Sequence, residues 1–143
     1  MNQFLPDVNV LIALHTPSHS SFGIVRRWFR SKGAENFSTC AITQSGFVRI
    51  SAQIALEENV GFEGAKIALD ALITQPGHAL WPMDIGYLKA TAPFERRIHG
   101  HRQITDAYLL GLVLHHNGKL ATLDRAILHL AGTEFRHSVE LIE

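Results

Sequence analysis

The chain has 143 residues and a mass of 15.9 kDa; 46% of its residues are hydrophobic, and its 13 basic and 13 acidic side chains cancel. A chain of this length buries roughly two thirds of its surface, so we expect a single domain over residues 1–143. Zero net charge excludes a strongly basic nucleic-acid-binding protein and a disordered acidic one. A lone cysteine, Cys40, excludes a disulfide framework and fits a buried thiol in a cytoplasmic protein. The apolar run over 107–114 is too short for a membrane span, so no membrane partner is expected.

The N-terminal elements are short and end at breaking residues. Residues 3–5 have the composition of a buried strand that Pro6 closes, and a helix follows over residues 8–14. Apolar residues then recur at intervals of three and four over residues 22–29, which predicts an amphipathic helix with its arginines on the surface. Trp28 lies on the apolar stripe of that helix, so we expect it in the core and not against a nucleic-acid base.

The middle of the chain repeats this alternation of strand and helix. Residues 36–39 predict a second strand, and an amphipathic helix begins at about Ala41. The clearest helical stripe covers residues 62–73, and residues 79–81 then predict a third strand with Trp81 buried. Asp84 is the expected N-cap of the helix that follows.

The C-terminal part supplies the last helices and strands. Thr105 opens a nearly all-apolar helix, and the Asn117-Gly118 turn leads into a strand over residues 119–122. Asp124 is the expected cap of a short helix, and residues 139–142 alternate as a last strand. About five short strands interleaved with helices predict an α/β fold, a three-layer α/β/α sandwich with a mostly parallel sheet.

Three aspartates fall at the predicted N-termini of helices: Asp7 and Asp124 follow strands, and Asp106 lies in the first turn of the apolar helix. The carboxyl ends of parallel strands meet at one edge, so these carboxylates are expected to converge. Close carboxylates raise one another's pKa values unless a cation lies between them, and oxygen ligands suit Mg²⁺ or Mn²⁺. Such a site suits phosphodiester hydrolysis. Each aspartate taken alone is better explained as a helix cap, so convergence decides between the two interpretations.

Three segments together resemble a PIN domain of the VapC type, found in toxins of bacterial toxin–antitoxin pairs. They are Leu5-Pro6-Asp7-Val8-Asn9-Val10-Leu11-Ile12-Ala13-Leu14, Arg102-Gln103-Ile104-Thr105-Asp106-Ala107-Tyr108-Leu109-Leu110 and Ala121-Thr122-Leu123-Asp124. Their order and spacing match over nearly the whole chain. The resemblance implies an α/β/α sandwich, an endoribonuclease that depends on Mg²⁺ or Mn²⁺, a homodimer, and a cognate antitoxin that covers the active site. Asp7, Asp106 and Asp124 match three of the four acidic positions of that family and are the expected metal ligands.

The sequence departs from the family pattern at the remaining acidic position. Where the family usually has a glutamate, in the helix after the second strand, this chain has Gln44. A neutral amide accepts a hydrogen bond or positions a water molecule, but it adds no negative charge and does not act as a general base. Gln44 is therefore expected to assist catalysis by positioning, or to have no role beyond that of a polar helix residue.

Positive side chains near the expected site are candidates for contact with RNA. The segment 96–102 is rich in arginine and histidine just before Asp106, and a phosphate backbone would pass there. The candidate contacts are Arg49, Arg97, His101 and Arg102, and the alternative for each is an ordinary solvated side chain. The adjacent His115 and His116 are not expected to form a metal site, because neighbouring residues do not share one helical face.

Two other functions compete with the ribonuclease. The strand followed by Asp7 faintly resembles the nucleophile motif of haloacid-dehalogenase-like phosphatases, but Asn9 stands where that chemistry needs a second aspartate. A PIN-like binding module that has lost activity at Gln44 is the other alternative. No Walker-type or dinucleotide glycine motif occurs in the sequence, which disfavours nucleotide-cofactor enzymes.

Overall fold

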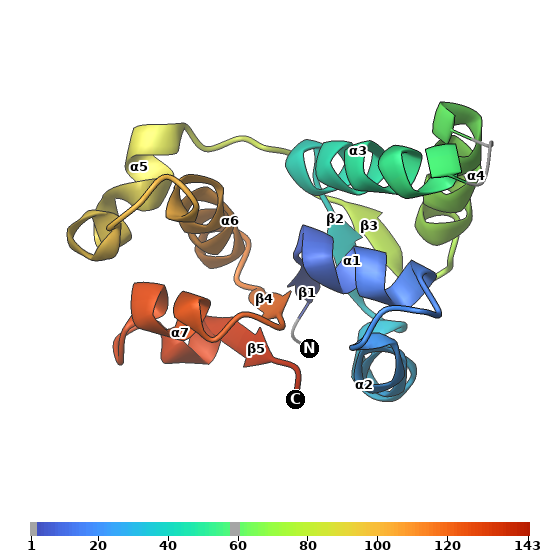
Figure 1. The fold of residues 1–143 in the computed structure, drawn as a ribbon. Helices are drawn as coiled ribbons and strands as arrows, with labels where there is room; N and C mark the ends of the chain where they lie inside the picture. Colours follow the sequence, from blue (N-terminus) through green and yellow to red (C-terminus); the bar gives the residue numbers. More distant parts are fainter. Residues whose placement is uncertain (1–2, 58–60) are drawn as a thin grey trace.

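Five short strands form one parallel sheet in the computed structural model, which describes residues 3–57 and 61–143 (Figure 1). In chain order they are β1 (Phe4–Pro6), β2 (Phe37–Thr39), β3 (His78–Leu80), β4 (Lys119–Thr122) and β5 (Val139–Leu141). Every pairing between neighbours is parallel, and the order across the sheet is β3-β2-β1-β4-β5. The parallel α/β sheet predicted from the sequence is confirmed.

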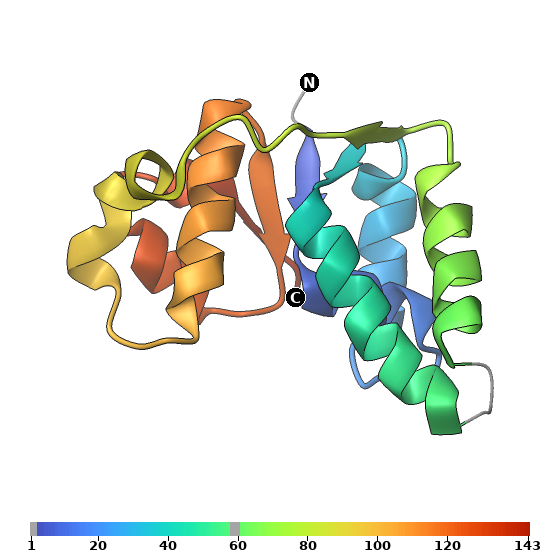
Figure 2. The same cartoon turned by 90° about the horizontal axis from the view of Figure 1, so that it is seen from above.

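Helices connect the strands and match the predicted order. The α-helices are α1 (Val8–His15), α2 (Phe22–Trp28), α3 (Ala41–Glu57), α4 (Gly61–Ile73), α5 (Tyr87–Thr91), α6 (Gln103–His115) and α7 (Ala126–Ala131). Three shorter turns of other helical types are η1 (Phe29–Gly33), η2 (Ala92–Arg97) and η3 (Arg136–Ser138). Figures 1 and 2 show α5, α6 and α7 on one side of the central strand β1, and α1 to α4 on the other.

The strand order reverses beside β1, which determines where a site can form. The chain builds β1, β2 and β3 outward in one direction, then returns to place β4 on the free side of β1. Leu5 pairs with Leu120 and Pro6 with Ala121, so β1 and β4 end at the same level. In open parallel sheets, ligands bind outside the carboxyl ends of strands at such a reversal. The residues after Pro6 and after Thr122 therefore meet at one crevice.

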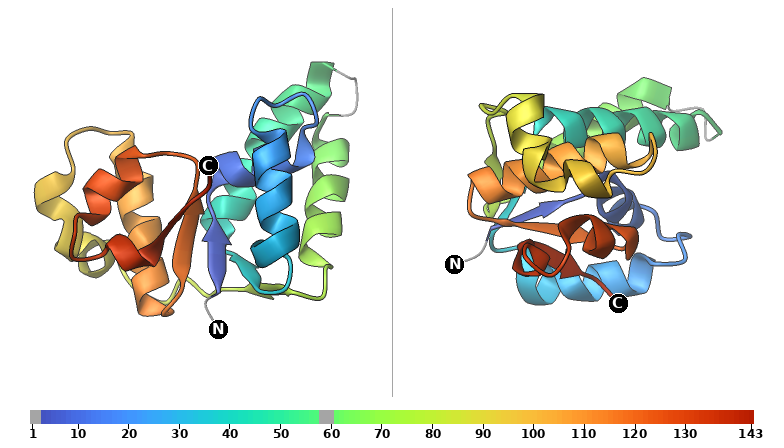
Figure 3. Two further views of the ribbon diagram at one scale, coloured as in Figure 1. Left: turned by 90° about the horizontal axis from the view of Figure 1, so that it is seen from below. Right: turned by 90° about the vertical axis from the view of Figure 1, so that its left-hand side faces the viewer.

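Successive strand residues pack into two different hydrophobic clusters, one on each face of the sheet. Leu5 and Leu120 join a cluster with α5, α6 and α7, whereas Phe4 and Ala121 join a second cluster with α1 to α4. This is the alternation expected of strands buried on both faces. Both views in Figure 3 show helices covering the two faces of the sheet. Trp28, Trp81 and Cys40 are buried, as the sequence predicted.

Two glycines allow helices to approach closely beside the crevice. A Cβ atom on Gly46 of α3 would lie 2.5 Å from Val8 Cγ2 of α1, and one on Gly111 of α6 would lie 2.1 Å from the Ala90 carbonyl oxygen of α5. Real Cβ atoms do not approach other atoms so closely, so larger residues would push these helices apart. The two glycines therefore help to fix the positions of α1 and α6.

Three expectations about helices were wrong in detail. Asp84 does not cap a helix, because α5 begins only at Tyr87 and its N-cap is Gly86. Helix α6 begins at Gln103, earlier than the predicted start at Thr105. Phe62, assigned to the buried stripe of α4, is 57% exposed. Among the described residues, no helix has both the length and the apolar character needed to cross a membrane.

Candidate functional site

Asp7 is held at the junction between β1 and α1 by two hydrogen bonds. As the N-cap of α1, it accepts a 3.0 Å hydrogen bond at Oδ1 from the backbone N–H of Val10. Its Oδ2 atom accepts a second bond, of 2.6 Å, from the hydroxyl of Thr122 at the end of β4. Only 7% of the residue is exposed. Asp7 is therefore both a helix cap and a buried carboxylate with one fixed orientation.

Thr122 links Asp7 to Asp124. Its Oγ1 atom donates to Asp7 and accepts a 3.0 Å hydrogen bond from the backbone N–H of Asp124. The Asp124 carboxylate in turn accepts a 2.9 Å bond from the N–H of Ala126, the first residue of α7. Asp124 is exposed, in contrast to Asp7. The N-cap of α7 is Arg125, so the prediction that Asp124 caps this helix is off by one residue, although the Asp124 carboxylate still bonds to the first N–H of the helix.

The charges of the three aspartates act on one another. Burial raises the pKa of Asp7 from 3.8 to about 6 against the lowering effect of its two hydrogen bonds, and the charges of Asp106 and Asp124 add to the rise. Burial likewise raises the pKa of Asp106 to about 6, with the charge of Asp124 as the second cause. The sequence-based expectation of converging carboxylates is supported by this mutual repulsion.

The spacing of the aspartates limits how they could share an ion. The donor oxygens of Asp7, Asp106 and Asp124 do not all lie within 4.8 Å of one another. Among residues 3–57 and 61–143, a group of three metal-binding side chains with that spacing occurs elsewhere. Ligands that bind one small ion at about 2.1 Å lie no more than about 4.2 Å apart. In this arrangement, at least one of the three carboxylates would act through a water molecule or through a second ion.

A pocket of about 460 Å³ lies beside Asp106 and Asp124. Its lining includes the loop before α6, with the candidate RNA contacts His101 and Arg102. That loop is braced by a 2.7 Å hydrogen bond from the backbone N–H of His99 to Gln103 Oε1. Since two carboxylates and an arginine meet in one hollow, a phosphodiester and a cation could be held together there.

The other two candidate RNA contacts do not line this pocket. Arg97 is the last residue of η2, and its guanidinium packs against Gly132 after α7, where a Cβ atom would lie 2.7 Å from Arg97 Cζ. Arg49 is exposed on α3. The structure therefore brings His101 and Arg102 to the carboxylates and leaves Arg97 and Arg49 apart from that hollow.

Gln44 lies on the first turns of α3 and is bonded to the end of β2. Its Nε2 atom donates a 2.9 Å hydrogen bond to Thr39 Oγ1, which is also 2.7 Å from His78 Nε2. Thr39 is fully buried, so it fixes the orientation of the half-buried amide. This contact orients the Gln44 side chain, which is compatible with a positioning role.

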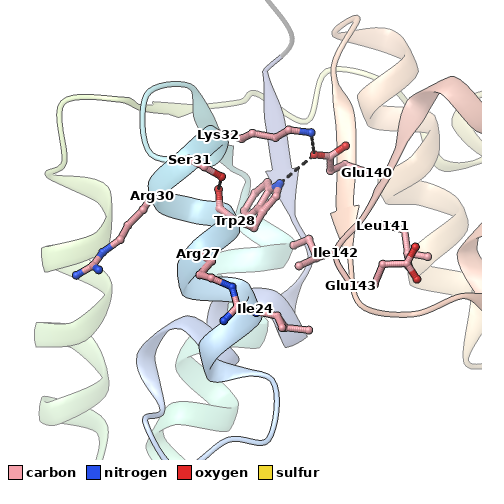
Figure 4. A pocket seen from close by; sticks show the side chains of 10 residues that line it. All are labelled: Ile24, Arg27, Trp28, Arg30, Ser31, Lys32, Glu140, Leu141, Ile142 and Glu143. Atoms are coloured by element: carbon pink, nitrogen blue, oxygen red, sulfur yellow. Dashed lines mark hydrogen bonds and ion pairs between the residues drawn. The ribbon is translucent and has the colours of Figure 1, made fainter.

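A larger pocket, of about 660 Å³, lies away from the aspartates (Figure 4). It is formed by α2, η1 and the C-terminal residues, and its lining shares no residue with the pocket at Asp106. Glu140 accepts hydrogen bonds from Trp28 Nε1 and Lys32 Nζ on its wall. Although burial raises the pKa of Glu140, these two bonds hold it below the ordinary value. The charge of Glu140 is satisfied internally, and the other carboxylate of the lining, Glu143, is paired with Arg125.

The sequence matches the PIN domain family over residues 4–133. The chain is 35% identical to Ribonuclease VapC39 of Mycobacterium tuberculosis over 124 residues, which cover 86% of this chain and 89% of that protein. It is 34% identical to Ribonuclease VapC38 of the same organism over 139 residues, 96% of each. The solved structure of FitAcB from Neisseria gonorrhoeae has the same fold, with a TM-score of 0.66 at 18% identity over 99% of this chain and 97% of that one.

These matches define the class of protein: the chain belongs to the PIN domain family. Within that family it is of the VapC type, as its relatives over most of the chain show. The resemblance inferred from the three aspartate motifs is therefore confirmed.

Two features of the structure were not predicted from the sequence. Thr122 was not singled out, although its place two residues before Asp124 at the end of a strand was a signal that it faces the crevice. The other is the close group of donors noted above, Asp84, His115 and His116. His115 and His116 were expected not to share one helical face, but their donor atoms come within 4.8 Å of each other because α6 ends at His115.

Proposed function

We propose that this protein is a metal-dependent endoribonuclease, the toxin component of a toxin–antitoxin pair. The observation that carries the proposal is the buried Asp7, linked through the Thr122 hydroxyl to the backbone of Asp124 and repelled by the charges of Asp106 and Asp124. Carboxylates that repel one another are stabilised by a cation that binds between them. The ribonuclease activity of its VapC relatives supports the same conclusion.

The donor set fits Mg²⁺ or Mn²⁺. Asp7, Asp106 and Asp124 offer oxygen atoms only, which these hard cations prefer, and they would hold the ion directly or through water. When bound, such an ion polarises the phosphodiester and lowers the pKa of a water nucleophile. Gln44 adds no charge to this set, so we expect weaker ion binding than a fourth carboxylate would give.

The protein side chains contribute orientation and charge. Thr122 fixes the direction of the Asp7 carboxylate, and the N-terminal turn of α6 fixes Asp106. With pKa values of about 6, Asp7 and Asp106 are partly protonated near pH 6 and mostly ionised at neutral pH, so a cation that binds beside them would displace protons only in mildly acidic solution. Arg102 and His101, on the wall of the adjacent pocket, would contact the phosphates of single-stranded RNA.

The partners that this function implies are a cognate antitoxin and a second copy of the chain. The side chains of Phe62 and Ile67 on α4 are 57% and 70% exposed, which is apolar area that a protein contact would cover. We place the activity in the cytoplasm, where RNA is available. Light scattering of the purified chain, with and without the antitoxin, measures both assemblies.

Cleavage of RNA by the purified, antitoxin-free protein tests the proposal. Single-stranded and structured RNA are incubated with Mg²⁺, Mn²⁺ or chelator, beside Asp106→Asn as the control for contaminating nucleases. We expect cleavage that requires the ion and is lost in the variant. Equal cleavage by the wild type and the variant would remove Asp106 from the site.

A PIN-like binding module without catalysis is the second candidate, and Gln44 is the observation that favours it. The acidic position is neutral, and its amide is engaged by Thr39. Ion binding at the aspartates without cleavage of any RNA class would select this function. A haloacid-dehalogenase-like phosphatase is disfavoured, because both Asp7 oxygens accept hydrogen bonds and Asn9 points to solvent in place of an acid.

A further inference from the structure

A second group of metal-binding side chains lies at the far end of α6 from Asp106. Asp84 belongs to the loop between β3 and α5, His115 is the last residue of α6, and His116 follows it. His115 lies nine positions after Asp106, which is about 14 Å along a helix axis. The group therefore belongs to a different edge of the molecule from the aspartates.

The donor atoms have the spacing of ligands around one ion. His115 Nε2 lies 3.1 Å from Asp84 Oδ1, and His116 Nε2 lies 3.5 Å from the same oxygen. All three donor atoms lie within 4.8 Å of one another. Ligands at about 2.0–2.1 Å around a tetrahedral Zn²⁺ ion are about 3.3 Å apart. The measured spacings of 3.1 and 3.5 Å are close to this value.

The protein holds these rings in place without an ion. The His116 ring stacks on Trp81, with centroids 4.6 Å apart and planes 20° apart, and Trp81 is buried with its Nε1 donating to Gln3 Oε1. The rings of His115 and His116 are nearly perpendicular, at 83°. His116 is the C-cap of α6, with φ −97° and ψ 6°, so it lies outside the regular helix, and its donor nitrogen is within 4.8 Å of that of His115. A ring that is already oriented loses little entropy when it binds a metal.

We propose that Asp84, His115 and His116 bind a divalent transition metal of the Zn²⁺ class. Two imidazoles and one carboxylate suit Zn²⁺, Co²⁺ or Ni²⁺ and do not suit Mg²⁺, which selects oxygen ligands. Asp84 and His115 have 54% and 37% of their side chains exposed, so water reaches the remaining coordination position. This site is independent of the ribonuclease site and of the ions expected there.

Binding exchanges one interaction of His116 for another. Its Nε2 atom is 3.1 Å from the carbonyl oxygen of Pro82, a hydrogen bond when that nitrogen carries the proton. In the metal-bound form the neutral ring keeps its proton on Nδ1, and the lone pair of Nε2 bonds to the ion. The ion would then fasten the loop after β3 to the end of α6.

Calorimetric titration of Zn²⁺ into the full-length, tag-free protein tests the proposal, in a buffer with saturating Mg²⁺ to occupy the oxygen ligands of the aspartates. The test variants are Asp84→Asn and His115→Gln, both on the surface. The controls are His129→Gln, an exposed histidine of α7 outside the group, and Asp106→Asn at the other site. Circular dichroism checks that each variant is folded.

We expect one Zn²⁺ site that persists in both controls and loses at least about tenfold in affinity in each test variant. Co²⁺ should give the visible absorption of a tetrahedral nitrogen and oxygen site in the wild type and lose it in Asp84→Asn. Zn²⁺ binding that is absent from the wild type, that is unchanged in both test variants, or that disappears with Asp106→Asn would overturn the proposal.

Discussion

The hydroxyl of Thr122 donates a 2.6 Å hydrogen bond to Oδ2 of Asp7, and this bond joins the end of β4 to the start of α1. Both residues are buried. The bond opposes the rise that burial causes in the pKa of Asp7. Thr122, in the C-terminal part of the chain, therefore lowers the pKa of Asp7, which lies near the N-terminus.

Replacing this hydroxyl should impair both stability and catalysis. Thr122→Val keeps the shape of the side chain but leaves Asp7 Oδ2 without a donor, which costs about 1–3 kcal/mol. The pKa of Asp7 should rise further, and cleavage should fall by about tenfold or more. Thr122→Ser keeps the hydroxyl and is the matched control. Denaturant unfolding and RNA cleavage measure the two effects, and equal behaviour of the two variants would contradict this role.

Asp106→Asn should separate catalysis from folding. The amide has the size of the carboxylate but removes a charge that repels Asp7 and Asp124, so RNA cleavage should be abolished while the fold persists. Without added metal, we expect the variant to unfold at a higher temperature than the wild type at pH 7.5. A lower melting temperature would show that Asp106 stabilises the fold through contacts other than its charge.

The stability of the metal-free protein should fall as the pH rises from about 4 to about 6. In this window the folded state binds more protons than the unfolded state, because folding raises the pKa of Asp7 from 3.8 to about 6. The stabilisation is complete below pH 4 and is lost as the pH passes 6, by on the order of 3 kcal/mol for Asp7. Asp7→Asn, which keeps the helix cap, should lose the Asp7 part of this slope in chelator and keep the part that comes from Asp106. Parallel slopes for the two proteins would be the contrary result.

Gln44→Glu should strengthen ion binding. The new carboxylate would restore the acidic position of the family, and Thr39 could donate its hydroxyl to it in place of accepting from the amide. We expect Mn²⁺ affinity to rise several-fold, measured by calorimetry, with cleavage at lower ion concentration. Gln44→Ala is the control for the side chain itself. If both variants bind Mn²⁺ like the wild type, residue 44 lies outside the ion's surroundings.

Adding a single methyl group at the contact between α1 and α3 should destabilise the protein. Gly46→Ala places a Cβ atom against Val8 Cγ2 and should cost about 1–3 kcal/mol in unfolding free energy. It should also weaken cleavage, because α1 carries Asp7 at its cap. Adding Val8→Ala should recover part of both losses, and a double-mutant cycle measures the coupling. Additive effects would show that the helices do not meet there.

The fold was predictable because its strands and turns carry strong local signals. Pro6 ends β1 and Asn117-Gly118 precedes β4, where Asn117 adopts the left-handed conformation, φ 56°, that commonly ends a helix. The three aspartates were predictable because each follows a strand or opens a helix. What they touch was not predictable, since the bond from Thr122 to Asp7 depends on the register between two strands far apart in sequence.

The incorrect predictions concern residues whose surroundings depend on tertiary contacts and not on the local sequence. The residue type of Asp84 predicts a helix cap, but α5 begins at Tyr87 with Gly86 as its N-cap, and the Asp84 carboxylate contacts two histidines instead. Those histidines were judged by the geometry of a continuous helix, whereas α6 ends between them. Phe62 fits the apolar stripe of α4, yet no neighbouring element of the described chain covers it.

At Gly111 of α6, the backbone of α5 lies in the space that a side chain would fill. A helix is stiff over so short a length, so whatever fixes Gly111 also fixes the residues a turn or two away on either side. Asp106 stands before it and His115 after it. The absence of a side chain at Gly111 therefore helps to set the positions of Asp106 near the start of α6 and of His115 at its end.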